Sequence, residues 1–236
     1  MRRGIGKIAL AAVMLAAFQL SAAKKLISSV DVDVVFSELP EIEFRKAVVP
    51  TVKNSSVNRW LMIKIEYTMD REVVKAPELR KERGKYYLKL DGFADDLKLR
   101  VRVLQDTGLK TSGKSIYGLY TGETAFYNVR LDGKKHQALM FVPGWFIDRY
   151  SRSPNGQVRT AAKNDFIVEA VFSSGGRDIA REYYGISGAK DFAGALSRVP
   201  ENMVFSGGVL PRSRTPWAVL NADRFDVENE FPSDGY

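Results

Sequence analysis

The chain of 236 residues contains no cysteine and a single histidine, His136. Without cysteine there is no disulfide scaffold, no thiol nucleophile and no lipidated cysteine of a bacterial lipoprotein. One histidine excludes the commonest zinc sites, which need several His or Cys ligands. It also means that serine–histidine catalysis would have to use His136 as its general base. We therefore expect no metal and no cofactor, and a fold that its hydrophobic core alone must hold.

Carboxylates are the remaining groups on which catalysis could rest. Glycoside hydrolysis needs only two of them, so Asp95, Asp96, Asp148 and Asp165 are conceivable donors. Nothing in their spacing brings any two to the required separation. Asp91, Asp95 and Asp96 lack the ordered loop and closing glutamate of a calcium site. We expect a protein that is not an enzyme.

The first 23 residues have the three parts of a secretory signal peptide. Two arginines and a lysine form a positive head, residues 8–20 are almost all apolar, and Ser21-Ala22-Ala23 ends the run in small side chains. Small residues three and one positions before the cut fit signal peptidase. We predict cleavage between Ala23 and Lys24, which exports the rest of the chain to the periplasm, the cell surface or the medium.

Two other interpretations of this leader stay open. Gly4 and Gly6 precede the apolar run as in a prepilin-like leader, and cleavage there would leave Lys7 at the new N-terminus. The position that usually carries glutamate in such leaders is Ala11, however. As an uncleaved anchor, the run is shorter than the roughly 20 residues that the hydrocarbon core requires.

The charge balance is mildly basic. The chain has 36 Lys and Arg against 28 Asp and Glu, a net charge of +8 that falls to +5 without the leader. An acidic glycan, an anionic lipid or an acidic protein is compatible with this excess. There is no basic helix or aromatic RNA-binding motif, so we expect no nucleic-acid partner. The row Lys98, Arg100 and Arg102 is a weak anion-binding candidate, since such a row is more typical of the solvated face of an antiparallel sheet.

After the leader the dominant hydrophobic period is two residues, as in a strand with one solvated face. It is clearest in residues 30–36, 60–68 and 97–103. In the second of these, the alternate side chains from Leu61 to Tyr67 share one face and should be buried. With turn signals every 8–12 residues or so, the pattern predicts an all-β protein, an antiparallel immunoglobulin-like β-sandwich with short helical insertions. We expect a single domain over residues 24–236, its last few residues disordered.

The connections are predicted from turn residues and breaks in the alternation. Helix is expected near residues 77–80, as a single turn within 143–150, and over residues 191–199. Strand 86–90 is expected to turn through Asp91-Gly92 and pair with strand 97–103. Three further strands, at residues 116–120, 125–131 and 137–142, should continue the meander. Residues 177–184 fit either strand or helix. His136 follows the turn at Asp132-Gly133 and is expected on the surface.

Two segments combine aromatic and basic residues. The first holds Trp145, Arg149 and Tyr150, and the second holds Arg212, Arg214 and Trp217 between and beside two prolines. Arginine and aromatic residues are enriched at protein interfaces, so these six residues form the candidate interaction surface. The alternative is that the rings seal one end of the sandwich while the arginines face water.

Residues 58–67 and 143–150, in a cysteine-free β-rich chain with a secretory leader, resemble an immunoglobulin-like family of exported bacterial proteins. Its members are encoded beside type IV pilus assembly components and are described as pilus-like. The resemblance implies a non-enzymatic role in pilus assembly, surface attachment or envelope structure, and it supplies no catalytic residues. The partners would be proteins of the envelope or the pilus. The alternative is an exported carbohydrate-binding or carbohydrate-active β-sandwich that stacks a sugar on Trp145 or Trp217.

Overall fold

The computed structural model describes residues 26–38, 59–71, 78–82, 85–89, 92–94, 96–151 and 160–218. The leader with its expected cleavage site at Ala23 and Lys24 lies outside these residues, as do the expected strand over 42–49 and the C-terminal residues from 219 on. Among the residues described, no helix is both long enough and apolar enough to cross a membrane.

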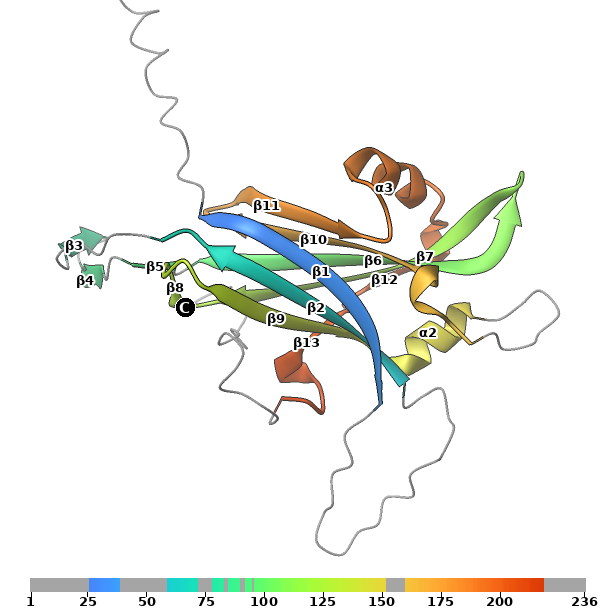
Figure 1. Ribbon diagram of the computed structural model, residues 1–236, viewed down its shortest axis with the longest axis horizontal. Coiled ribbons are helices and arrows are strands. Elements are labelled where there is room, and N and C mark those ends of the chain that lie inside the picture. The colour runs from blue at the N-terminus through green and yellow to red at the C-terminus, as the bar shows by residue number, and fades with distance from the viewer. Residues whose placement is uncertain are drawn as a thin grey trace, which may run out of the picture.

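Two sheets form the body of the protein (Figure 1). The first has the strand order β1 (Ile27–Glu38), β2 (Arg59–Met69), β9 (Lys135–Val142) and β13 (Leu210–Pro211). The second has the order β11 (Arg177–Tyr184), β10 (Phe166–Ser174), β6 (Leu97–Thr111), β7 (Lys114–Phe126) and β12 (Val204–Ser206). All the pairs are antiparallel except β12 with β7, which is parallel.

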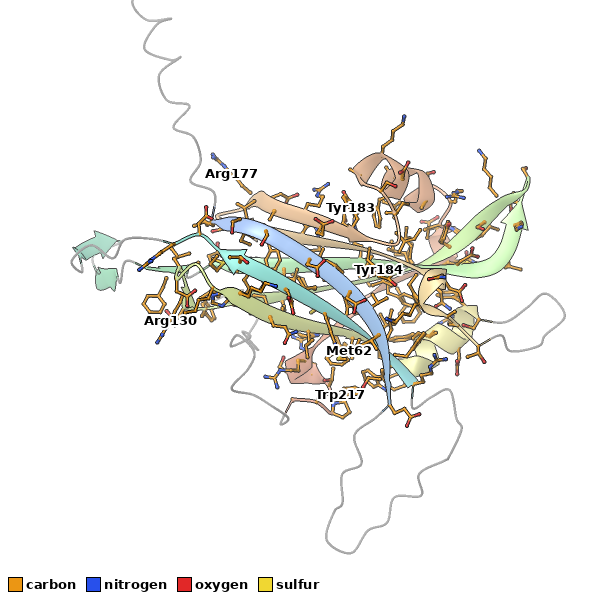
Figure 2. All side chains as sticks on the ribbon, in the orientation of Figure 1. Met62, Arg130, Arg177, Tyr183, Tyr184 and Trp217 are labelled. Carbon is orange, nitrogen blue, oxygen red and sulfur yellow. The ribbon has the colours of Figure 1, made fainter. Side chains whose placement is uncertain are left out.

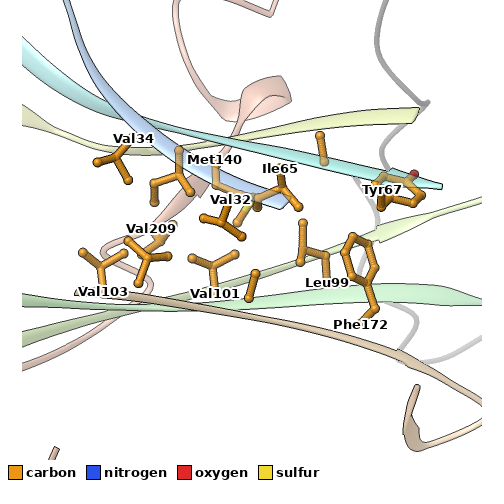
Figure 3. Close-up of a cluster of buried hydrophobic side chains, with 14 of the residues drawn as sticks. Val32, Val34, Ile65, Tyr67, Leu99, Val101, Val103, Met140, Phe172 and Val209 are labelled. Carbon is orange, nitrogen blue, oxygen red and sulfur yellow. The ribbon is translucent and has the colours of Figure 1, made fainter. Parts of the chain in front are cut away.

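The sheets face each other across one shared core, so the predicted β-sandwich is confirmed. Alternation along β2 turns Leu61, Ile63, Ile65 and Tyr67 inward, and all four are buried as expected. The opposing strand β6 contributes Leu99, Val101 and Val103 to the same core, and Figure 3 shows them across from Ile65 and Tyr67. Burial of such side chains stabilises the fold by roughly 1.5–3 kcal/mol each.

The edges of the two sheets approach each other on both sides. The edge strand β1 lies beside β11 (Figure 1), and Phe36 meets Phe166 edge to face at a centroid distance of 5.8 Å. On the opposite side, the Val209 amide donates to the carbonyl oxygen of Thr121 in β7. A Cβ on Gly122 would lie 2.0 Å from the carbonyl oxygen of Val209, so only glycine permits this approach.

Three expectations about secondary structure and strand pairing are wrong. Residues 78–82 are strand β3 rather than a helix, and they pair with β4 (Lys85–Lys89). The partner of β4 is therefore β3 and not β6. The meander is also broken: β7 is continuous to Phe126, the short β8 (Val129–Arg130) pairs with β5 (Phe93–Ala94), and β9 crosses to the first sheet beside β2.

Two short α-helices agree with the helical insertions predicted from the sequence. The helix α2 (Gly144–Tyr150) follows Pro143, and α3 (Ala189–Leu196) ends before Pro200. Residues 177–184 form the strand β11. Single 3-10 turns occur at η2 (Lys163–Asp165), η3 (Glu201–Met203) and η4 (Arg212–Arg214).

Candidate interaction surface

The three tryptophans of the chain meet at one place in the fold. Trp60 lies between the other two: its ring meets Trp145 at a centroid distance of 5.2 Å and Trp217 at 5.3 Å, both edge to face. Trp217 also stacks on Phe141 at 4.6 Å, with an angle of 13° between the ring planes. We call Trp60, Trp145, Trp217 and Phe141 the tryptophan cluster.

The cluster forms on the outer face of the first sheet because of the register of β2 and β9. Leu61 points into the core, so Trp60 and Met62 point outward, and Met62 is paired with Phe141 of β9. Figure 2 shows Met62 and Trp217 on this outer side. An apolar outer face has to be covered, and the turn η4 with Trp217 covers this one.

Trp60 is 3% exposed, yet its indole N–H has no hydrogen-bond acceptor in the described part of the chain. The indole group can only donate. A buried donor left without an acceptor costs about 1–3 kcal/mol. The packing of three aromatic rings against Trp60 offsets this cost, because edge-to-face ring pairs contribute roughly 0.5–1.5 kcal/mol each beyond their burial.

Trp145 is the exposed member of the cluster, with 47% of its surface in solvent. It lies on α2, whose buried residues Ile147 and Tyr150 face the sandwich. Helical spacing therefore turns Trp145 away from the core while its edge rests on Trp60. A large exposed ring held by a buried one is a feature of a binding surface, since little side-chain entropy is left to lose on binding.

A buried hydrogen-bond network fixes α2 to the second sheet. Gln105 of β6 donates to the carbonyl oxygen of Ile147 at 3.0 Å and to the Ser151 hydroxyl oxygen at 2.9 Å. The Tyr120 hydroxyl lies 2.7 Å from Gln105 Oε1 and 2.9 Å from the carbonyl oxygen of Phe146. The network binds the carbonyls of two consecutive residues in the middle of the helix, Phe146 and Ile147, and so sets the position of Trp145.

The electrostatics of this network keep it neutral. Burial raises the pKa of the Tyr120 hydroxyl well above its usual value, and the neighbouring Tyr150 raises it further. The hydroxyl therefore remains a hydrogen-bond donor at neutral pH. Tyr150 itself is buried, with its ring against Gly118. Its prediction as a surface residue is wrong, because helical spacing puts it on the inner face of α2.

Arg149 extends the surface beyond Trp145 along the same helix. It is exposed, and its guanidinium carbon lies 5.1 Å from the centroid of the Phe205 ring. Phe205 in turn packs on Phe146 at 4.5 Å. Residues four positions apart on a helix are neighbours, so Trp145 and Arg149 belong to one patch.

The second predicted segment contributes one residue to the cluster and one cation beside it. Trp217 joins the cluster, and Arg214 is exposed three residues before it. Arg212 is buried instead and donates to the carbonyl oxygens of Trp217 and Ala218, at 3.3 and 2.7 Å. The prediction that Arg212 faces a partner is therefore wrong: it holds the turn that carries Trp217.

The structure thus joins three of the six predicted surface residues, Trp145, Arg149 and Trp217, through contacts with residues that the sequence did not single out. These are Trp60 and Phe141, which connect the two segments, and Phe205, which carries Arg149. The sequence could have predicted the position of Trp60, because this residue lies at the start of the segment with the clearest alternation. The period of two in that strand puts Trp60 on the face opposite Leu61, away from the core.

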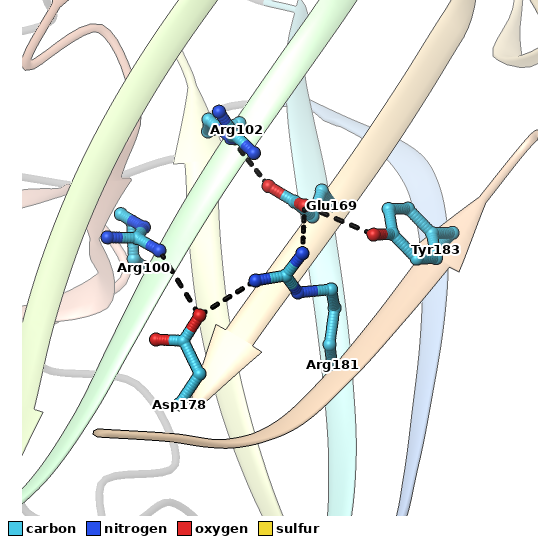
Figure 4. Close-up of polar contacts among 6 residues, drawn as sticks. All are labelled: Arg100, Arg102, Glu169, Asp178, Arg181 and Tyr183. Carbon is cyan, nitrogen blue, oxygen red and sulfur yellow. Dashed lines mark hydrogen bonds and ion pairs between the residues drawn. The ribbon is translucent and has the colours of Figure 1, made fainter. Parts of the chain in front are cut away.

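The basic row on β6 is an ion-pair network rather than an open anion site (Figure 4). Glu169 of β10 is 1% exposed and accepts a hydrogen bond from Arg102. Arg181 lies 3.6 Å and the Tyr183 hydroxyl 3.3 Å from the other carboxylate oxygen of Glu169. Arg100 pairs with Asp178 at 3.8 Å. Arg100 and Arg102 are therefore paired with carboxylates of the protein itself and do not form the anion-binding site that was considered.

Two of the carboxylates that were conceivable catalytic groups, Asp96 and Asp165, have local structural roles. Asp165 accepts a hydrogen bond from the Ala162 amide at 2.7 Å at the start of η2. Asp96 accepts one from the Gly175 amide at 3.2 Å in the next hairpin. Asp91 and Asp95 lie outside the described residues. In the part of the chain that is described, no three His, Asp or Glu side chains form a possible metal site.

His136 is more enclosed than its sequence position predicted. Its side chain is 12% exposed, stacks on Tyr67 at a centroid distance of 5.5 Å, and lies 3.3 Å from Asp132. Burial alone would raise the pKa of the Asp132 carboxyl group. The hydrogen bond from the Lys134 amide and the contact with His136 outweigh it and hold that pKa below the usual value.

No family model matches the chain, and no curated protein matches it either. Among solved structures, the crystal structure of a protein from Akkermansia muciniphila has a similar fold, with a TM-score of 0.56 and 13% sequence identity. The match covers 86% of this chain and 95% of that one. At this identity the likeness extends to the fold alone, a β-sandwich.

Proposed function

We propose that the protein is a non-enzymatic interaction protein of the bacterial envelope and that the tryptophan cluster with Arg149 is its binding surface. The observation that carries the proposal is Trp145, which is 47% exposed although its ring packs on the buried Trp60. Tryptophan and arginine dominate the binding energy of protein interfaces, and both lie on one face of α2. The hydrogen bonds of Gln105 and Tyr120 hold α2 in place, so the backbone that carries this surface is preorganised for binding.

The cellular setting comes from the sequence. The secretory leader supports export, and the resemblance of residues 58–67 and 143–150 to pilus-like proteins supports association with a pilus or another envelope assembly. N-terminal sequencing of the protein recovered from envelope or medium tests the first point. The expected first residue is Lys24; a start at Lys7 would indicate the prepilin-like leader, and an intact Met1 an anchor.

A second candidate function is carbohydrate binding by an exported β-sandwich. The observation that favours it is the same half-exposed indole, since an open aromatic face can stack on a sugar ring. The residues around Trp145 are less suited to a sugar, because Phe146 and Phe205 offer no hydrogen bonds to hydroxyl groups. We therefore prefer a protein partner.

A pull-down from envelope extract separates these possibilities. The bait is the chain from Lys24 onward, beside the double variant Trp145→Ala with Arg149→Ala. The matched control is Tyr127→Ala with Arg130→Ala, which removes a 46% exposed ring and an exposed arginine from another part of the surface. Proteins that the double variant loses and the control keeps, pilus components among them, would support the proposal.

Two results would count against it. Retention of the same partners by the double variant would reject this surface as the binding site. Hydrolysis of a glycan that is abolished by substitution of one acidic residue would reject the non-enzymatic role.

A further inference from the structure

The indole N–H of Trp60 is a buried donor that forms no hydrogen bond within the described part of the chain. This N–H lies under the rings of the cluster. Because Nε1 is covered, an acceptor reaches it only when a neighbouring ring moves. Trp145 is more exposed than Trp217, and it is the neighbour that a partner would touch first.

Two cations beside the cluster also lack a counterpart. Arg149 and Arg214 are exposed, and no carboxylate in the described part of the chain forms an ion pair with either. The arginines of the second sheet differ in this respect, since Arg102 and Arg181 both pair with Glu169. Among the described residues, the tryptophan cluster is thus an apolar surface with a buried donor, next to a helix and a turn that each carry an arginine without an ion pair.

We infer that the partner presents an extended, acidic segment that alternates carboxylates with aromatic or proline side chains. The apolar side chains would pack on Trp145, the carboxylates would pair with Arg149 and Arg214, and an oxygen of the segment would accept the Trp60 N–H. The inference rests on the proposed function, because it assumes that this surface binds a protein. It adds the chemistry of the segment that is bound.

A peptide is favoured over an acidic glycan by the composition of the surface. A sugar needs several polar side chains around the stacking ring to hydrogen-bond its hydroxyl groups. The described neighbours of Trp145 are instead the rings of Trp60 and Phe146, and Arg149 lies one turn further along the helix. Aromatic rings with arginine are the composition of a protein hot spot.

The test uses two blocked synthetic peptides and the chain from Lys24 onward. The acidic peptide is Asp-Phe-Pro-Asp-Phe-Pro, and its counterpart has lysine in place of both aspartates. We expect the acidic peptide to bind at least tenfold more tightly by calorimetry. The chain has three tryptophans, so three indole N–H signals appear in a ¹⁵N–¹H spectrum. The signal assigned to Trp60 through Trp60→Phe should move downfield on binding.

Charge controls make the result specific. Arg149→Gln with Arg214→Gln should reduce the affinity for the acidic peptide to that for the lysine peptide. Arg130→Gln with Arg177→Gln removes the same charge from two exposed positions away from Trp217 (Figure 2) and should leave the affinity within twofold. Equal binding of both peptides, binding of neither, or tighter binding of an oligogalacturonate would overturn the inference.

The two proposals can fail separately. Should the peptides fail while the pull-down still loses its partners on Trp145→Ala with Arg149→Ala, only the chemistry assigned to the segment is wrong. Should that double variant also keep every partner, the proposed binding surface is wrong as well.

Discussion

The rings of Trp145 and Trp60 meet edge to face at 5.2 Å, with an angle of 86° between their planes. The Trp60 ring is buried and its indole N–H has no acceptor among the described residues, whereas the Trp145 ring is half in solvent. The pair thus connects the fold to the proposed binding surface. Substitution of each member should separate stability from binding.

We expect Trp145→Ala to abolish partner binding and to lower the free energy of unfolding by about 0.5–1.5 kcal/mol, the contribution of its ring pair with Trp60. Trp60→Ala should lower the stability by about 3–5 kcal/mol, as for other large buried aromatics. Urea unfolding checks both values. A large loss of stability in Trp145→Ala would show that the exposed ring serves the fold.

The network beneath α2 predicts a coupling between the Tyr120 hydroxyl and the surface. Tyr120→Phe leaves Gln105 Oε1 and the Phe146 carbonyl without this donor and should cost about 1–3 kcal/mol. It should also weaken partner binding, because α2 carries Trp145. The control is Tyr117→Phe, whose hydroxyl has no hydrogen bond among the described residues and whose loss should be close to neutral. Equal effects of the two substitutions would argue against the network.

Glu169 should be the carboxylate whose loss the fold tolerates least. Glu169→Gln removes the buried counter-charge of Arg102 and Arg181, with an expected loss near 3 kcal/mol. This is the lower end of the range for broken buried pairs, because both arginines keep part of their surface in solvent. Asp178→Asn alters exposed pairs only and should cost less than about 1 kcal/mol. Urea unfolding would contradict the prediction if the two losses were equal.

Two glycines predict opposite effects of the same substitution. Gly122→Ala forces a Cβ against the Val209 backbone and should destabilise the protein by at least about 1–3 kcal/mol. Gly194→Ala lies in α3 with open space around it, and should stabilise the protein by about 0.5–1 kcal/mol. Thermal unfolding of both variants checks the signs. A stable Gly122→Ala protein would mean that the sheets separate more easily than the contact implies.

The turn before β9 predicts a pH dependence. The folded-state pKa of Asp132 is lower than its usual 3.8, so its charged form stabilises the fold above that pH. This contribution is lost as the pH falls through the lowered folded-state pKa. Asp132→Asn should therefore be less stable than the wild type at neutral pH and approach it below pH 3.8 in urea unfolding series. A difference that stays constant down to pH 2 or so would exclude titration of Asp132 as the cause.

For the long alternating segments, the sequence by itself determined that they are strands and which side chains of each share a face. The period of two in residues 61–67 and 97–103 gives the inward residues correctly, and the breaks in alternation locate α2 and α3. These are local properties, because side-chain direction along a strand follows from the backbone of that strand alone. The two aromatic-basic segments were visible for the same reason.

Only the tertiary structure decided which strands are neighbours and therefore what meets on the surface. Any two strand edges offer the same N–H and C=O groups, so alternation cannot say that β4 pairs with β3 or that β9 crosses to β2. That crossing puts Phe141 beside Met62 on the outer face. Trp217 stacks on Phe141, and Trp145 contacts Trp60 at the exposed edge of the cluster. Residues 60, 145 and 217 come together because burial of the outer face of the first sheet lowers the free energy of the folded protein. This free energy depends on contacts between distant segments, so it cannot be read from any one segment of the sequence.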